Sequence, residues 1–252
     1  MLLSIYFTEF NLEMHKMRTN RKRFNFSIPL VMMFILTLAS VVALLSVGGD
    51  ETVYYFNQLS FIPDPKTVCI DPGHGGQSSG ATGEKGKRLE KDDTLRLSLL
   101  VRDELEKRGY TVVMTRDSDT DISLEDRCKI ANKSKASLFV SIHRNSSTGK
   151  ASGCEAWIHS RNPSDDRLLA QNILDSLSLV GADTSRGLHT GYREGAEKNY
   201  YVNRCSKMPS VLAEIGFITS EKDNTYYDEN IDILAVAIAD GIETTLLEMN
   251  GE

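Results

Sequence analysis

The sequence lacks the motifs that most often assign a catalytic class. It has no HExxH helix, no G-x-S-x-G nucleophile elbow, no Walker A loop and no GxGxxG opening a helix. It also has no internal repeat and no low-complexity tract. With 252 residues, of which 40% are hydrophobic and 25% charged, it is typical of a globular chain with one sizeable core.

An excess of positive charge is absent as well. The whole chain has a net charge of −6, and the first 50 residues carry 5 of the 29 Lys and Arg and 3 of the 35 Asp and Glu. The remainder therefore has a net charge of −8. That balance gives no electrostatic basis for binding nucleic acid.

Cysteine is scarce, and its spacing excludes the common paired motifs. The four residues Cys69, Cys128, Cys154 and Cys205 include no CxxC pair. Cys69 lies within a predicted strand, which argues against a thiol nucleophile. We interpret all four mainly as small buried hydrophobic residues, with one disulfide left open because the domain is expected to be exported.

The first third of the sequence contains a hydrophobic segment. Residues 24–49 have no charged side chain, and residues 28–47 alone are long enough to cross a bilayer as a helix. The basic side chains in residues 1–23 indicate a cytoplasmic tail, so the chain after residue 49 is expected outside the membrane. The segment is either a signal anchor or a signal peptide, and its length favours the anchor. Residues 50–65 are predicted to form a linker between the membrane segment and the domain.

Residues 66–252 are predicted to form one three-layer α/β domain, with a mostly parallel twisted sheet between helices. We expect strands at 67–71, 111–115, 137–142, 200–203 and 210–215, and an edge strand at 154–159. We expect helices at 95–108, with a stripe of Leu95, Leu99 and Leu105, at 123–133 and at 165–179. The last helix shows the clearest apolar face, made of Ile231, Leu234, Ala235, Ile238, Ile242 and Leu246.

Chemically suggestive residues follow three of these strands. His74 stands among glycines in Asp-Pro-Gly-His-Gly-Gly, His143 follows Leu-Phe-Val-Ser-Ile, and Glu214 lies in Val-Leu-Ala-Glu-Ile-Gly. Because the carboxyl ends of parallel strands meet at one edge, these side chains are expected to converge. Glu90 begins the first helix, and the glycine-rich loop after His74 leads to it.

Two imidazoles and one carboxylate match the His₂Glu ligand set of catalytic zinc, which leaves a fourth position for water. A second carboxylate beside that water can then remove a proton and deliver it to a leaving nitrogen. Each residue also has a structural interpretation. Glu90 is favourable in a first helical turn and His143 suits a core strand, but Glu214 has an apolar context in which an unpaired carboxylate is costly. We interpret His159 and His189 as solvated.

The motifs together resemble the zinc-dependent N-acetylmuramoyl-L-alanine amidases over residues 66–248. The matching blocks are Asp-Pro-Gly-His-Gly-Gly (71–76), Gly86 with Glu90-Lys91, Thr115-Arg116 with Asp119, Leu124 with Arg127 and Ala131-Asn132, Ser-Ile-His-Arg-Asn (141–145) and Pro-Ser-Val-Leu-Ala-Glu-Ile-Gly-Phe (209–217). The resemblance implies that His74, Glu90 and His143 bind one Zn²⁺ and that Glu214 is the catalytic carboxylate. The implied reaction cleaves the amide between N-acetylmuramic acid and L-alanine in peptidoglycan.

The same resemblance implies a location at the outer face of a bacterial membrane or in the cell wall, with peptidoglycan as the partner. Residues 90–95 look like those of membrane-tethered sporulation amidases. Arg144 departs from the family pattern, and we expect it to alter the groove or contact an acidic part of the substrate. Two alternatives stay open: a metal-stabilised peptidoglycan-binding module without catalysis, and a zinc carboxypeptidase acting on stem peptides.

Overall fold

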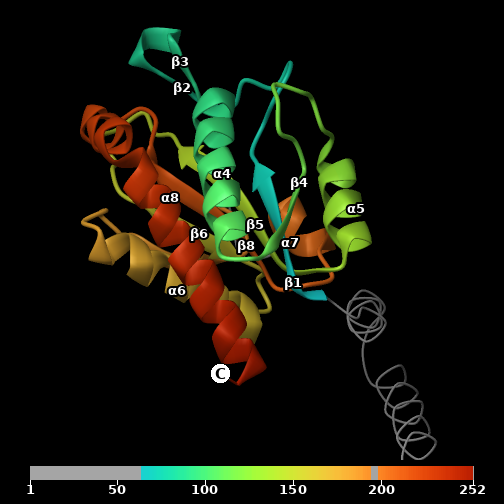
Figure 1. Cartoon of the computed structure of the whole chain (residues 1–252). Coiled ribbons are helices and arrows are strands. Elements are labelled where there is room, and N and C mark those ends of the chain that lie inside the picture. The colour runs from blue at the N-terminus through green and yellow to red at the C-terminus, as the bar shows by residue number, and fades with distance from the viewer. Residues whose placement is uncertain (1–63, 194–197, 252) are drawn as a thin grey trace, which may run out of the picture. The chain divides into compact units, whose positions relative to one another are not determined.

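The computed structural model describes residues 64–193 and 198–251 (Figure 1). The predicted basic tail, the hydrophobic segment and most of the predicted linker lie outside these ranges. Within them, none of the helices is both long and apolar enough to span a bilayer.

A six-stranded sheet with the order β4-β1-β5-β8-β6-β7 forms the middle layer. Its strands are β1 (Asp64–Pro72), β4 (Thr111–Met114), β5 (Ala136–Asn145), β6 (Glu155–Ile158), β7 (Gly187–Thr190) and β8 (Ser210–Phe217). Strands β4, β1, β5 and β8 are parallel, β6 pairs antiparallel with β8, and β7 runs parallel to β6. The predicted α/β fold with a mostly parallel sheet is confirmed.

Helices cover both faces of this sheet (Figure 1). One face carries α4 (Glu90–Lys107), α6 (Ser164–Leu179) and α8 (Glu221–Asn250), and the other carries the shorter α5 (Leu124–Ser134) and α7 (Tyr201–Cys205). A small hairpin projects before α4, made of β2 (Thr82–Gly83), the turn η1 (Glu84–Gly86) and β3 (Arg88–Leu89).

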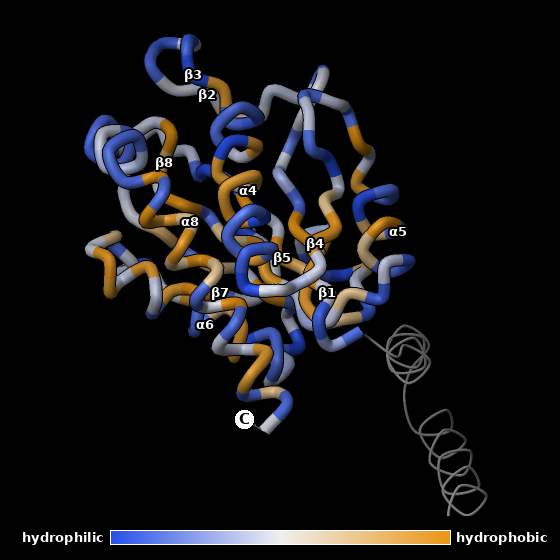
Figure 2. Tube along the Cα trace, in the orientation of Figure 1, coloured by the Kyte–Doolittle hydropathy of each residue, from blue (hydrophilic) through white to orange (hydrophobic). Residues whose placement is uncertain are grey.

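The strands divide their apolar side chains between two cores. Val68 and Ile70 belong to the larger core under α4, α6 and α8, while Cys69 between them belongs to the smaller core under α5 and α7. This alternation follows from the two-residue repeat of a strand. Figure 2 shows the hydrophobic residues of the strands and of the inner helix faces gathered in the interior.

Several predicted elements need correction. The predicted strand at 200–203 is wrong, because Tyr201–Cys205 is a short helix. The segment 154–159 does contain a strand, but β6 lies between β8 and β7, so the edge strand is β7. The stripe predicted on α4 is only partly right, since Leu105 is buried but Leu97 and Val101 accompany it in place of Leu95 and Leu99.

Two of the four cysteines form a disulfide and two are free. Cys128 in α5 and Cys205 in α7 form a disulfide across 77 residues of sequence. Cys69 and Cys154 are free and buried, as expected for small hydrophobic residues. The disulfide therefore joins the two helices on one face of the sheet.

Candidate metal centre

His74 lies in the loop that leaves β1. Its backbone adopts the left-handed conformation, with φ of 60°, and a bridge between Gly75 and Ser78 closes the turn. A non-glycine residue in this conformation is usually held there by its surroundings, often at a functional site.

The buried carboxylate of Asp71 supplies the support for this loop. It accepts hydrogen bonds from Thr115, Ser141 and Arg127. Arg127 also donates to the carbonyl oxygens of Pro72 (2.7 Å) and His74 (2.5 Å). Burial by itself raises the pKa of Asp71, but Arg127 and the two hydroxyl groups bring that pKa below its usual value. The charged pair thus fixes the backbone on both sides of Gly73.

The other candidate residues come from β5, β8 and α4. His143 and Glu214 stand opposite each other in the register of β5 and β8. Glu90 is the first residue of α4, and its Oε2 accepts a hydrogen bond of 2.7 Å from the amide of Ala81. Parallel pairing and one helix start therefore bring four distant segments together, as the sequence predicted.

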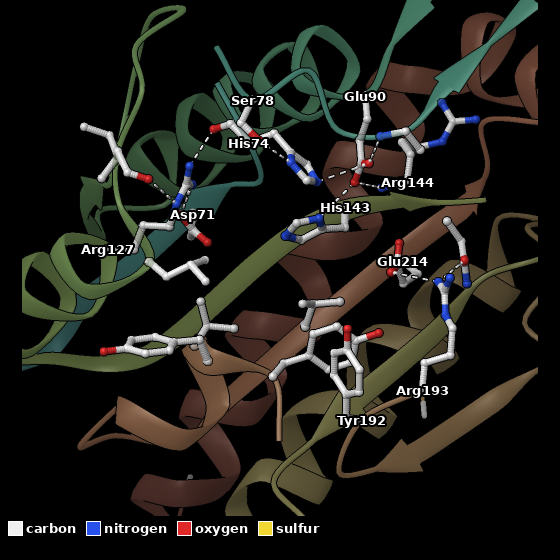
Figure 3. Close-up of a pocket in the computed structure, with 18 of the residues that line it drawn as sticks. Asp71, His74, Ser78, Glu90, Arg127, His143, Arg144, Tyr192, Arg193 and Glu214 are labelled. Atoms are coloured by element: carbon white, nitrogen blue, oxygen red, sulfur yellow. Dashed lines mark hydrogen bonds and ion pairs between the residues drawn. The ribbon is translucent and has the colours of Figure 1, made fainter. Parts of the chain in front are cut away.

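Three of these side chains converge (Figure 3). His74 Nε2 lies 3.2 Å from Glu90 Oε2, and His143 Nδ1 lies 2.9 Å from Glu90 Oε1. One donor atom from each residue lies within 4.8 Å of the other two. His74, Glu90 and His143 therefore form a group that could hold a metal ion.

Neighbouring residues orient these ligand atoms. Ser78 Oγ lies 2.9 Å from His74 Nδ1, so the other ring nitrogen of His74 faces Glu90. A Cβ atom at Gly73 would lie 2.3 Å from the ring of His143. A Cβ atom at Gly80, where φ is +68°, would lie 2.6 Å from both Glu90 and His74. The close packing at these two positions requires glycine.

The two glutamates have different electrostatic environments. Burial alone raises the pKa of Glu90, but hydrogen bonds from His143 and His74 lower it below its usual value. Burial, followed by the negative charge of Glu90, raises the pKa of Glu214 well above its usual value. Two carboxyl groups whose pKa values are shifted in opposite directions are typical of acid–base sites. In the described part of the chain, Glu214 Oε2 is buried without a hydrogen-bond partner.

A groove of about 890 Å³ passes over this group. Its wall includes the four candidate residues and the side chains of Leu124, Tyr192, Arg193, Tyr201 and Arg204. Peptide and sugar substrates both suit a groove with such mixed lining.

Comparisons with known proteins show the family of this chain. The family model of N-acetylmuramoyl-L-alanine amidases matches residues 68–244. The chain belongs to this amidase family. It is therefore a hydrolase of the cell-wall amidase type, and the family predicted from its motifs is confirmed.

Individual relatives are similar over the same region. The amidase chain is 41% identical to YqiI of Bacillus subtilis over 182 residues, which are 71% of this chain and 84% of that protein. It is 36% identical to the probable cell wall amidase LytH of Staphylococcus aureus, with 71% of this chain and 57% of LytH covered. A solved N-acetylmuramoyl-L-alanine amidase of Clostridium difficile 630 matches with a TM-score of 0.65 and 35% identity, covering 71% of this chain and 96% of that one.

The side chain of Arg144 in this amidase is buried within the protein, contrary to expectation. Its side chain is 1% exposed, and its guanidinium group donates to Asp93 (2.6 Å) and Asn224 (2.7 Å). It also stacks over the ring of Tyr227, 4.2 Å from the ring centre. Only its backbone N–H reaches the site, where it donates to Glu90 Oε1 over 3.1 Å. Arg144 therefore anchors α4 and α8 to β5 and does not meet substrate.

The two histidines interpreted as solvated also differ from expectation. His159 is buried, with 6% of its surface exposed. His189 is half-buried, and its ring stacks on Trp157 with the ring centres 4.7 Å apart. His159 follows β6, which lies inside the sheet, and His189 lies in the edge strand β7, where Trp157 of β6 covers one face of its ring.

Three residues near the metal group had no role assigned from the sequence. Asp71 and Arg127 were part of matching motifs, but their pairing across 56 residues follows no periodic pattern. Arg193 had no signal at all, since it lies in a loop and only the fold brings it beside Glu214.

Proposed function

We propose that this amidase hydrolyses the amide between N-acetylmuramic acid and the L-alanine of the stem peptide in peptidoglycan. In this proposal His74, Glu90 and His143 hold one zinc ion, and Glu214 is the catalytic carboxylate. The observation that carries the proposal is the convergence of three ligand atoms within 4.8 Å, with a buried carboxylate opposite His143 in the neighbouring strand.

The residues present fit zinc. Two imidazole nitrogens and one carboxylate oxygen are the donor set of many catalytic zinc sites. The orientation of His74 by Ser78 presents a single ring nitrogen to the centre, as ligand histidines require. When bound, zinc supplies Lewis-acid chemistry, which polarises a carbonyl group and lowers the pKa of water.

Glu214 is suited to move the proton. Its pKa is raised by burial and by the charge of Glu90, which brings its proton affinity closer to that needed near neutral pH. The carboxylate takes a proton from the attacking water and delivers it to the nitrogen of L-alanine as the amide bond breaks. Asn145 and Arg193 line the wall on the same side of the groove.

The rest of the chain is proposed to place this domain at its substrate. Residues 66–252 would be the catalytic domain, residues 24–49 a signal anchor or signal peptide, and residues 1–23 a cytoplasmic tail. The enzyme would then act at the outer face of the bacterial membrane or in the wall. Membership of a cell-wall amidase family supports this location.

Digestion of purified peptidoglycan tests the reaction. The expected result is new L-alanine amino termini on released stem peptides, with intact glycan strands. Release of terminal D-amino acids would instead indicate a carboxypeptidase, and binding without any cleavage would indicate a non-catalytic module.

The role of Glu214 is tested by Glu214→Gln. The variant should retain zinc and its fold, and lose about 100-fold to 10,000-fold in kcat, the range for loss of a general acid–base group. Glu229→Gln, an exposed glutamate on α8, is the matched control and should keep full activity. A rate for Glu214→Gln equal to that of the control would assign proton transfer to another group.

A further inference from the structure

Arg193 lies beside Glu214 on the wall of the groove (Figure 3). Its Nη2 lies 3.9 Å from Glu214 Oε1, and the same nitrogen donates a hydrogen bond to Asn145 Oδ1. Asn145 is in turn held by a 2.8 Å hydrogen bond from its Nδ2 to Glu155 Oε1. The guanidinium group is therefore positioned at the catalytic carboxylate by a buried amide.

Arg193 is a partly exposed member of the groove lining. A guanidinium group has five N–H donors, and the only acceptor for Arg193 among the described residues is Asn145 Oδ1. The side chain is 47% exposed. Arg127 and Arg144 are also part of the groove lining, but their side chains are only 4% and 1% exposed, and their terminal guanidinium nitrogens donate within the protein. Arg193 thus differs from both in having donors available for a ligand.

The proposed reaction fixes which half of the substrate meets this group. Glu214 delivers a proton to the leaving nitrogen, so the amine of L-alanine must lie at Glu214. The stem peptide then continues from that nitrogen on the side of Arg193, while the muramoyl carbonyl lies toward His74 and His143. Two extended residues span about 7 Å, so the second residue of the stem peptide falls within reach of the guanidinium group.

We infer that Arg193 binds a free carboxylate on the second residue of the stem peptide and so selects acidic over amidated stems. This inference rests on the proposed function, because it takes the direction of the substrate from the role of Glu214. A planar guanidinium group binds a carboxylate through two parallel hydrogen bonds, which a neutral amide cannot match. The net charge of −8 beyond residue 50 repels an acidic substrate in general, so its recognition needs a local cation.

A different role for Arg193 would give a different kinetic result. If the guanidinium group served only to position or balance Glu214, its loss would lower kcat by the same factor for every substrate. If it binds a substrate carboxylate, its loss changes KM for the acidic stem and leaves the amidated stem almost unaffected.

The test uses two synthetic N-acetylmuramoyl tripeptides that differ only in whether the α-carboxyl group of the second residue is free or amidated. The full-length, zinc-loaded enzyme should cleave the free acid with a kcat/KM about 10-fold to 100-fold higher, the range expected for a charge-assisted hydrogen bond. Arg193→Gln should remove this preference through KM, and Arg193→Lys should restore part of it. Arg96→Gln, an exposed arginine on α4, is the charge-matched control and should keep the preference.

Three results would overturn the inference. They are equal cleavage of both peptides by the unaltered enzyme, a preference that persists in Arg193→Gln, and an equal fall in kcat on both peptides in that variant. Calorimetry with Glu214→Gln, with and without Arg193→Gln, measures binding of the same peptides apart from turnover. Selective binding that depends on Arg193, without cleavage by the unaltered enzyme, would refute the proposed function and retain the carboxylate site.

Discussion

Replacement of Arg127 by methionine tests how the fold holds the loop of His74. The side chains of Arg127 and Asp71 are 4% and 1% exposed, and Nη1 lies 2.7 Å from Oδ1. Methionine retains much of the side-chain volume but removes the charged partner of Asp71 and the Arg127 hydrogen bonds to the carbonyl oxygens of Pro72 and His74. Breaking a buried pair in this way costs about 3–5 kcal/mol in the free energy of unfolding.

The penalty should depend on pH with a definite sign. The folded-state pKa of Asp71 lies below its ordinary value of 3.8, so its ionisation stabilises the fold above that pH and the contribution is lost as the pH falls further. In Arg127→Met the effect of burial on Asp71 is no longer offset by the charge of Arg127, so the pKa of Asp71 rises. The difference between the variant and the unaltered protein should therefore be largest at neutral pH and shrink in acid.

Urea unfolding followed by the fluorescence of Trp157, the single tryptophan, measures this difference. A loss of 3–5 kcal/mol also corresponds to a fall in Tm of about 6–20 °C for a domain of this size. Lys129→Met on the same helix is the control, because Lys129 is 63% exposed and its ion pairs are worth at most about 1 kcal/mol. An equal loss of unfolding free energy in the two variants, or a loss that grows in acid, would show that the buried pair of Arg127 and Asp71 does not stabilise the fold as described.

Two further changes test the surroundings of the site. The double variant Cys128→Ser/Cys205→Ser should lose about 2–4 kcal/mol in unfolding free energy, because the disulfide joins residues separated by 77 positions. As an internal check, the unfolding curve of this variant should match that of the unaltered protein after its disulfide is reduced. Gly73→Ala should weaken zinc binding by displacing His143, as measured by competition with a chelator. A Cβ atom at Gly149 would make only an ordinary contact of 3.6 Å with Ser147 Oγ, so Gly149→Ala should bind zinc normally. Normal zinc affinity in Gly73→Ala would mean that His143 is free to move away from the metal group.

The sequence was sufficient to locate three of the four candidate residues because they follow recognisable apolar strand segments. His74, His143 and Glu214 each come at the end of an apolar segment, and parallel pairing brings such ends to one edge. The last helix was equally clear, since all six residues predicted for its apolar face are buried. In both cases a local pattern was enough.

Other features depended on contacts that no local pattern contains. Leucines occupy more than one face of α4, so spacing alone did not distinguish Leu97 and Val101 from Leu95 and Leu99. The segment of α7 is short and begins with Tyr201 and Val202, which suit a strand and a helical turn alike. The position of Arg144 was within reach of prediction, because adjacent residues in a strand face opposite sides and His143 faces the groove.

X-ray absorption at the zinc edge of the purified chain is the decisive test of the proposed metal site. We expect one zinc per chain, with two histidine nitrogens at about 2.0–2.1 Å, carboxylate or water oxygen at a similar distance, and no sulfur. Replacement of His74, Glu90 or His143 should alter this spectrum. A sulfur ligand at about 2.3 Å, or a spectrum unchanged by all three replacements, would contradict the assignment.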